Sequence, residues 1–202
     1  MFISFEGTEG VGKSTLIKRV HEYFLEKNKE VILTREPGGT ALAEKVRNLL
    51  LQVDDTEVMC PDTELLLIYA ARSQHLSKVI LPALRDGKVV LSDRFTDASF
   101  AYQVKGRGLS KSKLEILNQT FVERMPDITL WLDAPIEVGM SRARARGQLD
   151  RFEKEKLSFF SKVREGYAEL HRQQPQRIYK VDATRSEQEV FKQVLEIFES
   201  KL

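Results

Sequence analysis

The segment that most constrains the fold is Gly7–Ser14, which reads GTEGVGKS: a glycine, four residues, then Gly-Lys-Ser. A short apolar run at 2–6 precedes it, and residues 15–24 carry apolar side chains at helical spacing. A strand, a glycine-rich turn and a helix are the context in which this pattern binds phosphate, because backbone N–H groups close around the anion at the positive end of the helix. An accidental match is the alternative, and the flanking strand and helix argue against it. The predicted phosphate-binding residues are Gly7, Thr8, Glu9, Gly10, Val11, Gly12, Lys13, Ser14 and Thr15.

Length, charge and cysteine content limit the class of protein. The chain has 202 residues and a formal net charge of +2, which predicts one domain spanning 1–202 and no broad nucleic-acid interface. Cys60 is the single cysteine, so an internal disulfide is excluded and a reducing compartment is expected. We expect no signal peptide, and no apolar run approaches the roughly 20 residues that span a bilayer. The expectation is a cytoplasmic protein with no membrane or nucleic-acid partner.

Short apolar runs alternate with helical patterns along the whole chain. The runs lie at 2–6, 31–34, 89–91, 128–132 and 178–181. Helical patterns lie at 15–24, 41–51, 61–85, 96–124 with a loop around 105–108, 135–147, 153–172, and from 186 onward. This alternation predicts an α/β fold of the P-loop NTPase kind, a doubly wound five-stranded parallel sheet with helices on both faces. Sites in such sheets form at the carboxyl ends of the strands, where the loops at 7–14, 35–40, 93–107 and 182–185 are expected to meet.

Polar residues at the ends of two apolar runs are candidates for a phosphate and metal site. Asp93 follows a buried run, where a P-loop protein places an acidic partner for Mg²⁺ beside the Ser14 hydroxyl. A carboxylate that caps the next helix is the alternative. Arg94 and Arg35 are candidate phosphate ligands, since a guanidinium fork binds two oxygens, although a solvated surface arginine is the commoner case.

A basic segment follows the fourth apolar run. Arg142, Arg144 and Arg146 alternate ahead of Gly147, and Arg151 lies beyond. At roughly 100° per residue, Arg142 and Arg146 share a helix face and Arg144 points away. A solvated helix face is the ordinary interpretation of such a run. Near a P-loop, a basic segment that breaks at a glycine can instead close over a triphosphate, neutralise charge on the transferred group and exclude water.

Together these motifs resemble bacterial thymidylate kinases over nearly the whole chain. The resemblance rests on 7–14, REPGGT at 35–40, YAAR at 69–72, DRF at 93–95, AYQ at 101–103, the lid segment at about 142–153, and VDAT at 181–184. Each motif is weak alone, but their order and spacing are specific. That family transfers the γ-phosphoryl group of ATP to dTMP, giving dTDP and ADP. The resemblance therefore implies ATP and Mg²⁺ as cofactors, dTMP as substrate, and a homodimer, which is usual in the family.

The resemblance implies a donor side of the site. Lys13 and the amides of the P-loop hold the ATP phosphates, Ser14 and Asp93 serve Mg²⁺, and the backbone at 183–185 borders the adenine. The P-loop carries no arginine, and the basic residues lie in the lid instead. This resembles the branch whose lid supplies the catalytic arginine, for which Arg146 is the expected residue, with Arg142 also contacting ATP.

The resemblance also implies an acceptor side. Arg35 and Arg94 hold the 5′-phosphate of dTMP, and Arg72 hydrogen-bonds the thymine. The residues implied at the nucleoside are Ser99, Tyr102 and Gln103, with Tyr102 disfavouring a 2′-hydroxyl and Glu9 near the sugar and phosphate. The implied catalytic residues are Lys13, Arg94, Arg146 and Glu9.

One position departs from the family pattern. Four residues before the thymine-binding arginine, the family usually has a phenylalanine that stacks on the base, and this chain has Ile68. An aliphatic side chain packs on the ring without aromatic stacking geometry, which predicts a change in base affinity or selectivity. Tyr69 points elsewhere on the helix and does not replace it.

Three other functions remain open at this point. A kinase for another nucleoside or nucleotide would use the same sheet and differ in its acceptor. A non-catalytic P-loop switch would sense a nucleotide, but it has no use for a basic lid, and the chain lacks the Asn-Lys-x-Asp stretch of GTP-binding switches. An inactive homologue is disfavoured by the intact Lys13, Ser14, Asp93 and Arg146. The three histidines show no metal-ligand spacing and are interpreted as ordinary surface or core residues.

Overall fold

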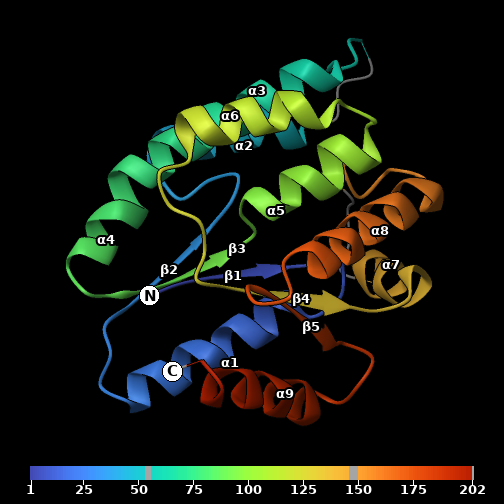
Figure 1. The fold of residues 1–202 in the computed structure, drawn as a ribbon. Coiled ribbons are helices and arrows are strands. Elements are labelled where there is room, and N and C mark those ends of the chain that lie inside the picture. The colour runs from blue at the N-terminus through green and yellow to red at the C-terminus, as the bar shows by residue number, and fades with distance from the viewer. Residues whose placement is uncertain (53–55, 146–149, 202) are drawn as a thin grey trace.

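The computed structural model describes residues 1–52, 56–145 and 150–201. Its centre is a sheet of five parallel strands in the order β2-β3-β1-β4-β5 (Figure 1). The strands are β1 (Phe2–Glu6), β2 (Val31–Arg35), β3 (Val89–Asp93), β4 (Ile128–Asp133) and β5 (Ile178–Asp182). Each strand contains one of the apolar runs, so the predicted sheet is confirmed. All strands except β1 extend one or two residues further at their carboxyl ends than the runs do.

The strand register aligns the carboxyl ends of neighbouring strands. Arg35 of β2 lies opposite Asp93 of β3, and Asp93 lies opposite Phe5 of β1. On the other side of β1, Glu6 lies opposite Trp131 of β4. Because the chain winds in opposite directions from β1, a crevice is expected at this edge of the sheet, directly ahead of the P-loop.

Helices α1 (Lys13–Glu26) and α9 (Glu187–Glu199) cover one face of the sheet (Figure 1). The side chains of α1 that are buried there, Leu16, Val20 and Phe24, repeat at helical spacing and pack with apolar residues of β1, β3, β4 and α9. This periodicity is the reason the segment after the P-loop forms an amphipathic helix on the sheet.

The other face carries a larger group of helices. They are α2 (Ala41–Leu51), α3 (Pro61–His75), η1 (Leu76–Ile80), α4 (Leu81–Arg85), α5 (Thr96–Ser99), η2 (Phe100–Gly106), α6 (Lys111–Phe121) and α8 (Leu157–Gln173). Trp131 of β4 and Ile178 of β5 point to this side and pack with Tyr167 and Phe160 of α8. Thr40 accepts a hydrogen bond from the Ala43 N–H and so caps α2.

Two helical segments differ from expectation. The pattern at 61–85 is not one α-helix, because the π-helical segment η1 lies between α3 and α4. Pro82 falls in the first turn of α4, where a missing N–H is tolerated. The loop expected around 105–108 starts later, since η2 is also π-helical and continues to Gly106. Apolar periodicity does not distinguish α-helical from π-helical turns, which is why both boundaries were missed.

Helix α7 (Ile136–Arg144) lies directly against the P-loop. A Cβ atom built on Gly10 would lie 1.9 Å from the carbonyl oxygen of Gly139, and one built on Gly139 would lie 2.4 Å from that of Glu9. Two glycines therefore let the two backbones touch. Across the described ranges, every helix is too short or too polar to cross a membrane.

Candidate active site

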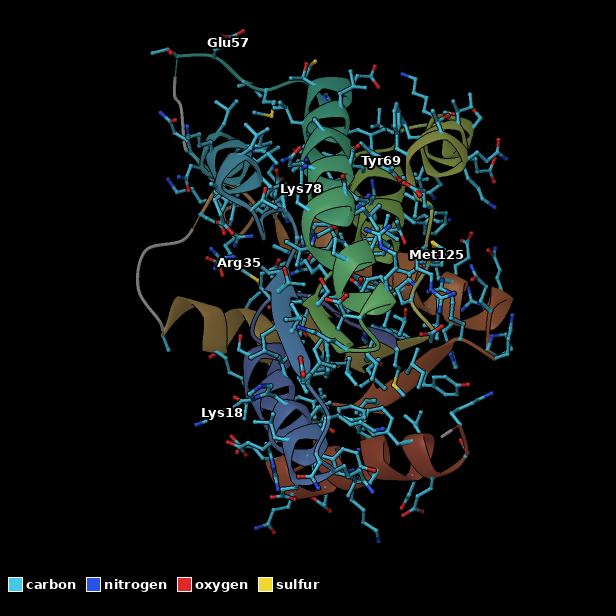
Figure 2. All side chains as sticks on the ribbon, turned by 90° about the vertical axis from the view of Figure 1, so that its left-hand side faces the viewer. Lys18, Arg35, Glu57, Tyr69, Lys78 and Met125 are labelled. Atoms are coloured by element: carbon cyan, nitrogen blue, oxygen red, sulfur yellow. The ribbon has the colours of Figure 1, made fainter. Side chains whose placement is uncertain are left out.

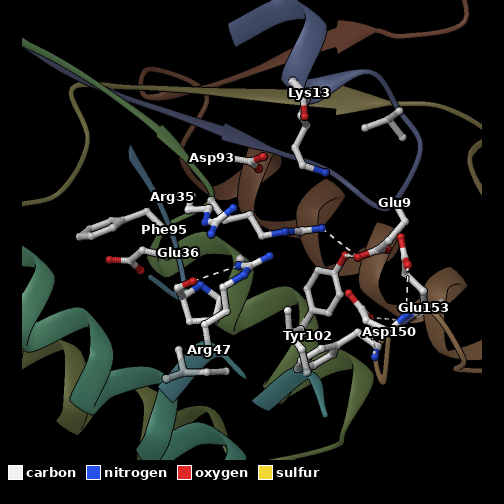
Figure 3. A pocket seen from close by; sticks show the side chains of 18 of the residues that line it. Glu9, Lys13, Arg35, Glu36, Arg47, Asp93, Phe95, Tyr102, Asp150 and Glu153 are labelled. Carbon is white, nitrogen blue, oxygen red and sulfur yellow. Dashed lines mark hydrogen bonds and ion pairs between the residues drawn. The ribbon is translucent and has the colours of Figure 1, made fainter. Parts of the chain in front are cut away.

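A pocket of about 420 Å³ opens at the carboxyl edge of the sheet (Figure 3). The P-loop, the ends of β2 and β3, α3, η2 and the segment from 150 all contribute to its wall. The predicted site residues that line it are Glu9, Gly10, Val11, Gly12, Lys13, Ser14, Thr15, Arg35, Ile68, Arg72, Asp93, Arg94, Ser99, Tyr102, Gln103 and Arg142. Gly7 and Thr8 are not among the lining residues, and Arg146 lies outside the described part of the chain.

The P-loop is folded tightly around the ammonium group of Lys13. Gly7 has φ of 135°, and a Cβ atom there would lie 2.5 Å from the carbonyl oxygen of Leu132, so only glycine fits. The Lys13 ammonium donates to the carbonyl oxygens of Thr8 (2.9 Å) and Gly7 (3.3 Å). Burial, and then the nearby charge of Arg94, lower the pKa of Lys13 to about 8. An anion bound in the pocket would stabilise the charged form of Lys13.

Glu9 and Tyr102 face each other on the pocket wall (Figure 3), and with Arg94 they form one hydrogen-bonded cluster. Arg94 Nη2 donates to Glu9 Oε1 at 2.9 Å, and the Tyr102 hydroxyl donates to the same carboxylate at 2.8 Å. The guanidinium carbon of Arg94 lies 4.7 Å from the centre of the Tyr102 ring. Burial raises the pKa of the Tyr102 hydroxyl well above its ordinary value, so the hydroxyl remains a donor. The cluster thus joins the P-loop, the end of β3 and η2.

A second layer of residues fixes the position of Arg94. Its backbone is left-handed, with φ of 70°. Glu6 accepts the N–H of Phe95 (2.7 Å) on one oxygen and the hydroxyl of Tyr167 (2.8 Å) on the other, while Arg94 Nη1 donates to Tyr167 at 3.3 Å. Burial and the charge of Asp97 raise the pKa of Glu6 to about 8.

Asp93 has the surroundings of a metal ligand. Its Oδ1 atom is buried and has no hydrogen-bond partner among the residues that the structure describes. Helix α5 begins after Phe95 without a side-chain cap, so Asp93 does not cap it. Ser14 lines the same pocket. In the described ranges no three acidic, histidine or cysteine residues gather into a metal cage, so a cation here would need oxygens from a bound phosphate.

Arg35 lies where β2 ends and turns toward α2 (Figure 2). Its Nη2 atom donates to Glu44 at 2.8 Å, and this hydrogen bond lowers the pKa of Glu44. The Arg35 side chain is 54% exposed. Arg47 lies about one turn after Glu44 in α2. It also lines the pocket and donates to the Pro37 carbonyl oxygen at 2.9 Å. Burial, and then Arg35, lower the pKa of Arg47, so an anion between the two arginines would relieve their repulsion.

Arg72 is buried at the inner end of the pocket, with 2% of its surface exposed. Its Nε atom donates to Glu36 at 2.7 Å, and Nη2 donates to the Phe95 carbonyl oxygen and to the Ser99 hydroxyl. Its Nη1 atom is buried and has no partner in the structure. Ile68 borders the same pocket from the preceding turn of α3.

The segment after the lid is fastened to α3. Arg151 Nη2 donates to Glu64 at 2.7 Å, and Gln103 Nε2 donates to the other oxygen of that carboxylate at 2.8 Å. Glu64 is 1% exposed. Phe152 lines the pocket and packs edge-on against Tyr102. Arg142 is exposed in α7 and also lines the pocket.

Several supporting residues were not identified from the sequence as single positions. They are Glu6, Glu36, Glu64, Arg47, Tyr167 and Phe152. The sequence does contain a signal for two of them. Glu6 lies inside an otherwise apolar run and Glu64 lies on the apolar side of a helix, and such a carboxylate is rarely buried without a partner. Tyr69 lies between α3 and α6 (Figure 2), and its hydroxyl donates to Asn118. It therefore points away from Ile68, which agrees with the prediction that Tyr69 does not replace the stacking residue.

Comparisons with known proteins agree on one family. The family model described as thymidylate kinase matches residues 5–194. The chain is 67% identical to a thymidylate kinase of Acinetobacter baumannii (strain SDF), over 97% of this chain and 98% of that protein. It is 57% identical to a thymidylate kinase of Pseudomonas putida (strain W619), over 91% and 88%. The crystal structure of thymidylate kinase from Ehrlichia chaffeensis superposes with a TM-score of 0.79 at 33% identity, over 98% of both chains.

Proposed function

The chain belongs to the thymidylate kinase family, and we propose that the pocket at the carboxyl edge of its sheet is where ATP and dTMP meet. The reaction is the phosphorylation of dTMP to dTDP with ATP as donor. The cluster of Glu9, Arg94 and Tyr102 carries this assignment. It places a P-loop residue within 2.9 Å of a residue expected to bind the acceptor phosphate.

The 5′-phosphate of dTMP is assigned to Arg94 and Arg35. A guanidinium has five N–H donors, and Arg94 uses its Nη atoms on Gly7, Tyr167 and Glu9, which leaves donors for a ligand. Arg35 is held at the rim by Glu44, and a phosphate dianion would compete with that carboxylate.

The nucleoside is assigned to the inner end of the pocket. The unpartnered Nη1 of Arg72 supports a hydrogen bond to the thymine, since a buried donor without a partner is unfavourable. Ser99 and Gln103 line the same region, and Ile68 offers an aliphatic surface to the base. Tyr102 and Glu9 are assigned to the sugar, where Tyr102 would leave no room for a 2′-hydroxyl.

The donor phosphates are assigned to the P-loop, with Lys13 released from its own carbonyls to bind them. Mg²⁺ fits this site, because Asp93 presents a buried, unpartnered oxygen and Ser14 a hydroxyl in the same pocket. When bound, the ion would neutralise charge on the phosphate oxygens. Lys13 and Arg94 would hold the two phosphates in line and close together.

Little proton transfer is required of the protein. A phosphate monoester loses its second proton near pH 6, so the acceptor oxygen is a nucleophile at neutral pH. Positioning and charge neutralisation therefore carry the reaction. We assign the charge that forms on the transferred group to a lid arginine, Arg146 first, with Arg142 on the ATP side. The basic lid and the P-loop without arginine support this assignment.

A homodimer and a cytoplasmic location are further proposals. Helices α2, α3 and α6 pack side by side (Figure 1) and leave large apolar residues exposed, namely Leu42, Leu49, Leu66, Ile116 and Phe121. Exposed apolar groups of this kind favour a protein interface. Light scattering should give twice the chain mass, and Leu66→Glu with Ile116→Glu should halve it; a monomeric wild type would exclude the dimer. The lone Cys60 supports the cytoplasm.

The pocket assignment is tested by ADP release with ATP, Mg²⁺ and each of dTMP, dUMP, UMP, CMP, AMP and GMP. We expect strong preference for dTMP. Glu9→Gln and Arg94→Lys should raise the KM for dTMP far more than the KM for ATP, because both residues face the acceptor. Equal effects on the two KM values would contradict this placement.

A further inference from the structure

The arginine at the inner end of the pocket is held by a relay of three side chains, of which Glu36 and His75 are buried and Thr34 is half-buried. Glu36 Oε2 accepts from Arg72 Nε at 2.7 Å, and Glu36 Oε1 lies 3.0 Å from His75 Nδ1. On the far side of the ring, His75 Nε2 lies 2.6 Å from the Thr34 hydroxyl. We propose that Glu36 and His75 are positioning residues that aim Arg72 at the base and so set its selectivity. The proposal rests on the assignment of Arg72 to the thymine.

The guanidinium of Arg72 has one orientation that satisfies its partners. Nε is taken by Glu36, and Nη2 by the Phe95 carbonyl oxygen (3.1 Å) and the Ser99 hydroxyl (3.0 Å). The rings of Tyr69 and Phe95 lie 4.6 and 5.3 Å from its central carbon. Among the described residues nothing bonds Nη1, so it is the nitrogen of Arg72 that remains for a ligand. Any rotation that moved Nη1 would break the bonds made by the other two nitrogens.

His75 prevents Glu36 from taking a different grip on Arg72. A carboxylate and a guanidinium commonly pair through two parallel hydrogen bonds. Here one carboxylate oxygen is occupied by His75, which leaves a single bond to Nε. Without His75, Glu36 could bind a second guanidinium nitrogen and turn the group away from Ser99. His75 does not line the pocket, and of its two hydrogen-bond partners Glu36 is the one that bonds Arg72.

The histidine ring is itself locked in place. His75 is fully buried; because the Glu36 carboxylate accepts, Nδ1–H donates to it, and Nε2 hydrogen-bonds the Thr34 hydroxyl. Gly39 closes over the ring with φ of 85°, and a Cβ atom there would lie 2.5 Å from it. The relay thus connects the end of β2 to the last turn of α3, one turn after Arg72.

The consequence for specificity follows from donor chemistry. Thymine carries an acceptor oxygen at C4, whereas cytosine carries an amino group that donates. A guanidinium only donates, so an accurately placed Nη1 bonds the C4 oxygen of thymine, whereas with cytosine Nη1 and the amino group would be two donors facing each other. Loss of the relay should therefore reduce the preference for dTMP over dCMP, while the ATP site is unaffected.

The test compares His75→Leu, His75→Asn and Glu36→Gln, each alone and combined with Arg72→Ala. We expect His75→Leu and Glu36→Gln to raise the KM for dTMP and reduce the dTMP/dCMP ratio of kcat/KM by about ten- to a hundred-fold, the range for a hydrogen bond to a charged group. The KM for ATP should not change. His75→Asn keeps a donor near the Nδ1 position and should recover most of the ratio. His21→Leu, on α1, is the matched control and should match the wild type.

The combined variants separate the relay from a general loss of structure. If the relay acts only through Arg72, then His75→Leu will add no further loss of selectivity to Arg72→Ala. An unchanged dTMP/dCMP ratio in His75→Leu, with Arg72→Ala impaired, overturns the relay. An unimpaired Arg72→Ala overturns the assignment of Arg72 itself. Should His75→Leu fail to fold, Thr34→Val removes only the outer hydroxyl and should lower the same ratio; no change there also overturns the relay.

Discussion

The contact between α7 and the P-loop predicts that Gly139→Ala will slow the reaction more than it destabilises the fold. The new Cβ atom would lie 2.4 Å from the Glu9 carbonyl oxygen, whereas ordinary contacts begin at 3.4 Å. The two backbones must therefore separate by about 1 Å, a shift that can reduce the rate of a positioned reaction about 100-fold. Because Glu9 holds Arg94 and Tyr102, the shift is transmitted to the acceptor side.

The expected effect of Gly139→Ala on stability is smaller. Overpacking usually destabilises by about 1–3 kcal/mol, and replacing glycine by alanine within a helix returns about 1 kcal/mol. The net change of about 0–2 kcal/mol corresponds to a melting temperature lower by at most about 8 °C in a chain of this size.

The assay is ADP release at saturating ATP and dTMP, with a thermal melt on the same samples. Ser141→Ala, an exposed position on the same helix, is the matched control and should retain the wild-type kcat. A Gly139→Ala variant with kcat within twofold of the wild type would show that the P-loop tolerates this displacement, and the reasoning would be refuted.

Four further predictions concern single side chains. Because the pKa of Lys13 is about 8, its charge declines above that pH, and calorimetry should find weaker ATP binding at pH 9 than at pH 7, with Lys13→Met losing this pH dependence. The pKa of Glu6 is raised from 4.5 to about 8. Between these pH values Glu6 ionises in the unfolded chain but not in the folded one, so the free energy of unfolding falls as pH rises. Relative to the wild type, the free energy of unfolding of Glu6→Gln in urea should therefore increase by about 1.4 kcal/mol per pH unit across that window. Ile68→Phe should lower the Kd for dTMP by adding a stacking ring, and an unchanged Kd would mean that the base is held by another surface. Arg146→Ala should lower kcat about 100-fold or more with little change in KM, whereas a change confined to KM would remove its catalytic role.

The parts of the fold that were predictable are those set by local patterns. Each strand contains an apolar run, and the three central strands β1, β3 and β4 are almost entirely buried. The P-loop is a contiguous motif in the sequence. The π-helical segments were not predictable, because their apolar spacing resembles that of an ordinary helix. The sequence predicts His75 to be an ordinary surface or core residue, and it is a core residue. Its bond to Glu36 was not predictable, because Glu36 lies 39 positions away in a loop.

The candidate site divides in a similar way. Arg35 and Arg94 were assigned to a phosphate because they lie at strand ends beside the P-loop, and Arg72 was assigned to the thymine because of the family resemblance. The protein partners of Arg72 and Arg94 could not be derived, because they lie far away in the chain: Arg72 reaches Glu36 over 36 positions and Arg94 reaches Glu9 over 85. Sequence spacing identifies which groups can meet a substrate, but which carboxylate holds each group depends on the tertiary packing.

Three of the buried carboxylates at this site share one physical role. They are Glu6, Glu36 and Glu64, each at most 4% exposed. A flexible, charged side chain recognises a ligand specifically only if its remaining N–H donors already bond protein groups. Otherwise ligand binding has to order the side chain, which costs free energy. Glu36 commits the Nε of Arg72, and Glu6 holds the backbone next to Arg94. A carboxylate that served only as a counter-charge could sit anywhere nearby, whereas these accept directed bonds on both oxygens. For Glu36, whose partner Arg72 is assigned to the base, substitution should therefore alter specificity.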